Sequence, residues 1–66
     1  MTTLDDAQLS SIVATVDDTV IRVADLGERL DGGGTSDAAN ALFEAERSLK
    51  MASRALARAR RVLGEP

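Results

Sequence analysis

The chain lacks the side chains on which most enzymatic and metal chemistry depends. Its 66 residues include no cysteine, histidine, tryptophan or tyrosine, and only one phenylalanine. The usual general base and the thiol nucleophile are therefore missing, and nearly every transition-metal site is excluded. Without cysteine, the sequence gives no sign of an oxidising compartment. We expect no enzyme activity, no cofactor and no bound metal.

Long hydrophobic runs are also missing. Asp17, Asp18, Arg22 and Asp25 interrupt the longest apolar stretch, so no membrane-spanning segment and no membrane partner are expected. The acidic start at residues 4–6 lacks the basic and then apolar layout of a signal peptide. A cytoplasmic location is the default expectation. The preference for arginine over lysine, with much alanine, glycine and valine, is typical of GC-rich bacterial genomes.

Proline is absent before Pro66, and glycine is concentrated at residues 32–34. Three consecutive glycines continue a helix only at high cost, so they are predicted to form a turn, with Gly32 in the left-handed position after a helix. The sequence therefore predicts one all-α domain over residues 1–66, an antiparallel hairpin of helices over about residues 4–31 and 36–63.

Three helix ends carry capping signals. Thr3 followed by Asp6 resembles a capping box at the first helix, and Thr35 or Ser36 can cap the second. Gly64, followed by Pro66, is expected to end the second helix. These signals support the predicted bounds.

The first helix has a competing interpretation. Residues 10–16 and 19–23 are rich in β-branched side chains, and with Asp17 and Asp18 between them they could form a β-hairpin. Against this, leucine or valine recurs every seven residues from Leu9 to Leu30, which favours a helix. The β-branched content means that this helix is stabilised mainly by packing.

The second helix carries two columns with a seven-residue period. The leucine column is Leu42, Leu49, Leu56 and Leu63, and the alanine column is Ala38, Ala45, Ala52 and Ala59. Both are predicted to face the first helix, where alanine allows close approach and leucine fills the space beside it. The full predicted seam is Leu9, Val13, Val16, Val20, Val23, Leu30, Ala38, Leu42, Ala45, Leu49, Ala52, Leu56, Ala59 and Leu63. Facing residues are expected to have numbers that sum to about 67.

A second apolar stripe is predicted beside this seam. Its residues are Leu4, Ile12, Thr19, Leu26, Ala41, Ser48, Met51, Ala55 and Val62. Two helices form a single layer, so this stripe faces water unless another chain covers it. We expect it to associate, most simply in a homodimer that completes a four-helix bundle, with a heterologous protein as the rival partner. Scattered surface alanines are the simpler reading of the same residues.

Charge is divided along the chain. Residues 1–46 sum to −8, whereas residues 47–66 sum to +5. Antiparallel pairing is expected to bring Arg58, Arg60 and Arg61 alongside Asp5 and Asp6, at helix ends whose dipoles suit them. The basic side chains on the outer side of the second helix are named here the arginine stripe: Arg47, Lys50, Arg54, Arg58 and Arg61.

Two further residues are expected on the far sides of their helices. Ile21 and Phe43 either form an anchor for a partner, or Phe43 folds over the glycine turn; we favour the second reading.

These patterns favour a non-enzymatic, self-associating interaction or regulatory module. The alternative is a small nucleic-acid-binding regulator that uses the arginine stripe to contact phosphates. The net charge of −3 and the lack of aromatic side chains beside the stripe argue against that alternative.

Overall fold

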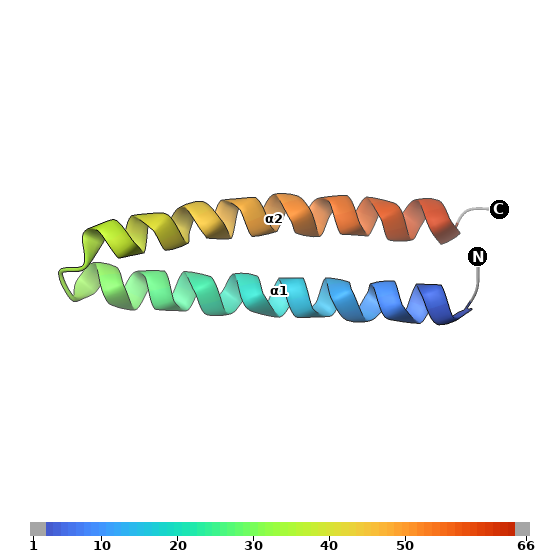
Figure 1. Cartoon of the computed structure of the whole chain (residues 1–66), viewed down its shortest axis with the longest axis horizontal. Coiled ribbons are helices and arrows are strands. Elements are labelled where there is room, and N and C mark those ends of the chain that lie inside the picture. The colour runs from blue at the N-terminus through green and yellow to red at the C-terminus, as the bar shows by residue number, and fades with distance from the viewer. Residues whose placement is uncertain (1–2, 65–66) are drawn as a thin grey trace.

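The computed structural model describes residues 3–64, except for the side chain of Thr3, and it contains two helices. Helix α1 spans Thr3–Gly32 and helix α2 spans Ser36–Gly64. They run antiparallel as a hairpin, with the turn at one end (Figure 1). The predicted hairpin is confirmed, and its predicted bounds lie within about one residue of the observed ones. The β-hairpin interpretation is wrong, because residues 10–23 all lie within α1.

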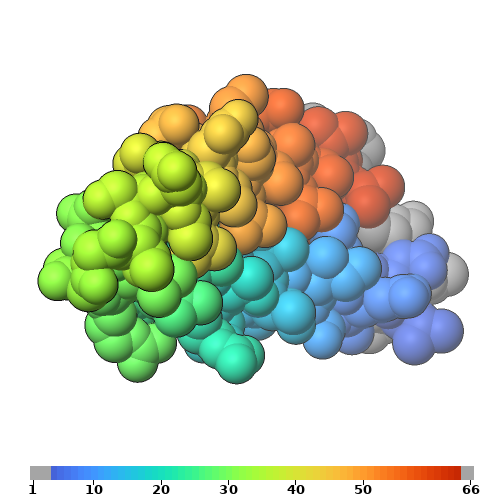
Figure 2. Space-filling view, turned by 60° about the vertical axis from the view of Figure 1, so that its left-hand side comes forward, coloured from blue at the N-terminus to red at the C-terminus, as the bar shows by residue number. Residues whose placement is uncertain are grey.

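The molecule is a rod with one layer. Its extents are 51 × 15 × 10 Å, and the two helices lie side by side along their whole length (Figures 1 and 2). Among residues 4–64 only Gly27 and Ala39 are buried. Neither helix combines the length and the apolar character needed to cross a membrane. The fold therefore has a line of contact between two helices in place of an enclosed core.

Helix α1 accommodates its threonines by internal hydrogen bonds. The hydroxyl of Thr15 donates to the carbonyl of Ser11 at 3.0 Å, and that of Thr19 donates to the carbonyl of Thr15 at 2.7 Å. Both hydroxyls are thereby paired within the helix, although threonine residues favour non-helical backbone conformations in short peptides. Such bonds do not themselves favour the helix, so packing on α2 is what stabilises this β-branched segment.

The turn ends α1 with two nested hydrogen bonds. The amide of Thr35 donates to the carbonyl of Leu30 at 3.1 Å, and the amide of Gly34 donates to that of Asp31 at 3.4 Å. This is the Schellman pattern, which needs a left-handed residue at its centre. Gly34 supplies it with a φ of +86°. The prediction that Gly32 takes this position is wrong, since α1 continues through Gly32.

Thr35 serves both helices. Its hydroxyl donates to the carbonyl of Leu30 at 2.7 Å, and its own carbonyl accepts the amide of Ala39 at 3.0 Å as the first bond of α2. The side chain of Thr35 thus closes α1. The prediction that it caps α2 is not met. The capping box proposed for Thr3 and Asp6 lies outside the described side chains.

Candidate interaction surface

The contact between the helices uses the whole predicted seam of α1. Leu9, Val13, Val16, Val20, Val23 and Leu30 are all partly covered, and the glycine in the same run, Gly27, is buried. On α2 the leucine column is partly covered at Leu42, Leu49 and Leu56, and exposed at Leu63. The leucine column therefore faces α1 except at its C-terminal end.

The alanine column does not line this contact. Ala38, Ala52 and Ala59 are exposed, and only Ala45 is partly covered. Instead, the column one residue further along the chain faces α1, with Ala39 buried and Glu46 and Ser53 partly covered. The alanine column and the column that begins at Ala39 lie on opposite sides of the leucines, at equal angles from them. The sequence prediction chose the alanine column only because its side chains are small. Ala38, Ala52 and Ala59 therefore lie outside the seam, and the prediction for these three residues is wrong.

Cross-helix contacts fix the register. Ser53 Oγ lies 2.5 Å from Asp17 Oδ1 in a hydrogen bond, and Gly27 packs against Leu42 and Phe43. The residue numbers of these pairs sum to 69 or 70, whereas the sequence predicted about 67. Leu42 therefore lies beside Gly27 and not beside Val23 as expected. The turn is therefore centred between Gly34 and Thr35, about one residue later than the expected position between Gly33 and Gly34.

Phe43 packs on α1 through the space that Gly27 leaves open. A Cβ atom added to Gly27 would lie 2.8 Å from Phe43 Cε1 and 3.5 Å from Leu42 Cβ. The ring thus takes the place of a side chain on α1, two turns from the glycine turn. The prediction that Phe43 lies on the far side of α2 with Ile21 is wrong, and so is the reading that it folds over the turn. Ile21 is 61% exposed.

Glu46 is an acidic side chain within the contact column. Its side chain is only 21% exposed, and its carboxylate pairs with Lys50 Nζ at 3.1 Å, one helical turn away. Lys50 thereby compensates a carboxylate that α1 partly shields from water.

One side of the helix contact is polar. Asp17, Val20, Lys50, Ser53 and Arg54 line a shallow groove there. Because Asp17 and Thr19 flank the α1 contact line on opposite sides, Thr19 must lie on the other side of the hairpin. The same reasoning places Lys50 and Ala52 on opposite sides of α2.

The other side is apolar, and we name it the open face. On α1 it consists of every seventh residue from Ile12 to Leu26. On α2 it consists of two neighbouring columns, one that begins at Ala38 and one that begins at Ala41. Its members are Ile12, Thr19, Leu26, Ala38, Ala41, Ala45, Ser48, Ala52, Ala55, Ala59 and Val62; all are exposed except Thr19 and Ala45, which are partly covered. It therefore contains most of the predicted association stripe together with the alanine column.

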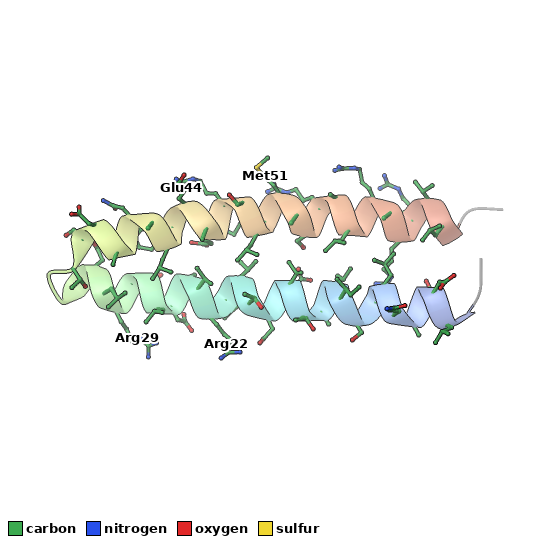
Figure 3. The ribbon with its side chains drawn as sticks, in the orientation of Figure 1. Arg22, Arg29, Glu44 and Met51 are labelled. Carbon is green, nitrogen blue, oxygen red and sulfur yellow. The ribbon has the colours of Figure 1, made fainter. Side chains whose placement is uncertain are left out.

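Two members of that predicted stripe lie elsewhere. Met51 is 66% exposed and points away from α1 on the outer edge of α2, the edge that also carries Glu44 (Figure 3). Leu4 is exposed near the start of α1. Arg22 and Arg29 point outward from the opposite edge, the outer edge of α1 (Figure 3).

The arginine stripe is exposed along its whole length. Within residues 3–64 the ion pairs are Arg22–Asp18 and Lys50–Glu46, each inside one helix. Lys50 of the stripe thus pairs with an acidic side chain of its own helix. The expected pairing of Arg58, Arg60 and Arg61 with Asp6 is not among these ion pairs.

Acidic side chains do not converge on a metal-binding geometry in residues 3–64. No known protein family, curated protein or solved structure matches the chain.

Proposed function

We propose that this protein is a non-enzymatic helical module that associates with itself through the open face and presents its charged outer surfaces to a protein partner. The observation that carries the proposal is the open face itself. It runs along a one-layer rod whose contact line fully buries only Gly27 and Ala39 among residues 4–64. A cytoplasmic location belongs to the same proposal.

Surface area supports association. A compact monomer of 6.9 kDa is expected to expose about 4,000 Å². The chain exposes 4792 Å², an excess of about 800 Å². One partner in an interface of ordinary size contributes about this area. Two hairpins stacked on their open faces would form a second layer and supply the core that a single hairpin lacks.

The test compares two isoleucines of α1. Ile12 belongs to the open face. Ile21, nine residues later, lies on the opposite side of α1, because nine residues rotate about 180° beyond full turns. We expect wild type to sediment as a dimer at micromolar concentration. Ile12→Asp should remain helical by circular dichroism and become monomeric, because dimerisation would bury an unpaired carboxylate.

Ile21→Asp is the matched control and should remain dimeric. A monomeric wild type would refute self-association. Equal loss of dimer in both variants would refute the assignment of the interface to the open face.

The arginine stripe supports a second candidate function, contact with the phosphates of a nucleic acid. The favouring observation is that Arg47, Arg54, Arg58 and Arg61 form none of the ion pairs found in residues 3–64. Binding of RNA or DNA should then weaken steeply with added salt and be lost in the Arg54→Ala/Arg58→Ala double variant. No binding at low salt would eliminate this candidate.

A further inference from the structure

We infer that the partner on the open face is a second copy of this chain in one orientation, with both glycine turns at the same end of the bundle. This inference rests on the proposed function and adds the geometry of the assembly. Bulky side chains on the α1 half of the open face match gaps on the α2 half in both size and spacing.

The two halves of the open face differ in side-chain size. The α1 half presents Ile12, Thr19 and Leu26 at seven-residue intervals. The α2 half presents pairs of small residues four apart, also at seven-residue intervals: Ala41 with Ala45, Ser48 with Ala52, and Ala55 with Ala59. Each pair forms a shallow gap on the helix surface into which a larger side chain can pack.

A twofold axis parallel to the helices places these halves against each other. Such an axis lays α1 of one copy on α2 of the other and leaves every residue at its own height along the rod. The register of the hairpin then gives the facing residues, since numbers that sum to 69 or 70 share a height.

Each bulky side chain meets a gap in this arrangement. Leu26 lies at the height of residues 43 and 44, between Ala41 and Ala45 of the second copy. Thr19 lies at the height of residues 50 and 51, between Ser48 and Ala52. Ile12 lies at the height of residues 57 and 58, between Ala55 and Ala59. All three levels therefore match at once.

Charges at the edges of the rod fit the same orientation. Arg22 and Arg29 occupy the outer edge of α1, and Glu44 occupies the outer edge of α2 (Figure 3). The axis lays these two edges together. Glu44 of the second copy then lies at the height of residues 25 and 26, between Arg22 and Arg29. Asp25 stands at that same height and lines one groove with Arg22 and Arg29. The two guanidinium groups therefore offset two carboxylates, and the choice of orientation rests on the match in side-chain size.

A twofold axis perpendicular to the helices gives a poorer fit. It would lay α1 on α1 and α2 on α2, with the turns at opposite ends. Leu26 would then approach the level of Ile12 in the second copy, bulky against bulky, while alanines faced alanines across α2. The two Asp18 side chains would also meet near the midpoint of the rod. Glu44 would gain Arg58 as a partner, but the mismatch in size would remain.

Single-cysteine variants test the orientation, because the chain has no cysteine of its own. Gly32→Cys and Gly64→Cys mark the two ends of the rod. Both glycines have open space where a Cβ would lie and ordinary backbone angles. Each variant is spin-labelled and the distance between the labels of the two copies is measured by pulsed electron paramagnetic resonance, after sedimentation has established that the variant is dimeric.

We expect short distances in both variants, about 20 Å, since neighbouring helix axes are about 8–10 Å apart. Turns at opposite ends would instead separate the labels by roughly 35–45 Å in both variants, because each helical residue adds about 1.5 Å. Long distances in a dimeric protein overturn the inferred orientation and leave self-association intact. A monomer overturns both.

Discussion

The half of the hairpin next to the turn and the half next to the chain ends differ in how closely the helices pack. Near the turn, Gly27 and Ala39 are buried and Phe43 occupies the space above Gly27. In the other half, every residue of α2 from 57 to 64 is exposed, including Leu63.

This difference shows where a two-helix rod can be stable. Only the small residues Gly27 and Ala39 are fully buried among residues 4–64. The larger side chains of the contact line, Phe43 included, stay partly covered. We infer that the turn half carries most of the stability of a single hairpin, and that the terminal half opens first.

The strongest test of this difference removes the large side chain in each half. Phe43→Ala should lower the free energy of unfolding by about 2–3 kcal/mol, since it leaves the space above Gly27 empty. Leu63→Ala should cost less than about 1 kcal/mol, because that side chain is already exposed. Both values come from urea unfolding at one fixed protein concentration, because self-association makes stability depend on concentration. Equal losses would contradict the contrast between the two halves.

The next test fills the space that Phe43 occupies. Gly27→Ala gains about 1 kcal/mol in helix propensity, but its new methyl group would clash with the Phe43 ring, and overpacking costs about 1–3 kcal/mol. We expect a net loss of about 1 kcal/mol in thermal or urea unfolding.

A double-mutant cycle checks the cause of that loss. In a Phe43→Leu background the clash is reduced, so Gly27→Ala should become neutral or stabilising, with a coupling of about 1–2 kcal/mol. The same loss in both backgrounds would show that the ring is not responsible.

The smallest expected effect concerns the hydrogen bond near the middle of the rod. Ser53→Ala removes the bond to Asp17, but alanine gains helix propensity and the bond is exposed. The net change should lie within about 0.5 kcal/mol. Ser11→Ala, whose hydroxyl makes no cross-helix bond in the described structure, is the control for propensity. A loss above about 1 kcal/mol relative to that control would show that this exposed bond stabilises the hairpin more than expected.

Much of the architecture was predictable from the sequence. The glycine turn, the two helix spans and the contact line of α1 follow from local preferences and from the seven-residue period of Leu9, Val16, Val23 and Leu30. The leucine column of α2 was likewise predictable, since its size and spacing admit few other arrangements.

The neighbouring columns were not predictable in this way. Alanine at Ala52 and serine at Ser53 stand on either side of the leucines, and neither size nor hydrophobicity decides which of them faces α1. No local signal indicated that Phe43 would pack on Gly27, because the pairing depends on a register shift of about three residues.

The sequence by itself determined two long helices and the turn between them, because helix propensity, glycine and period act over a few neighbouring residues. Only the tertiary structure decided the rotation of α2 about its axis. That rotation places Phe43 over Gly27 and Ser53 beside Asp17, contacts between residues that are distant in the chain. It turned the alanine column away from α1 and onto the open face.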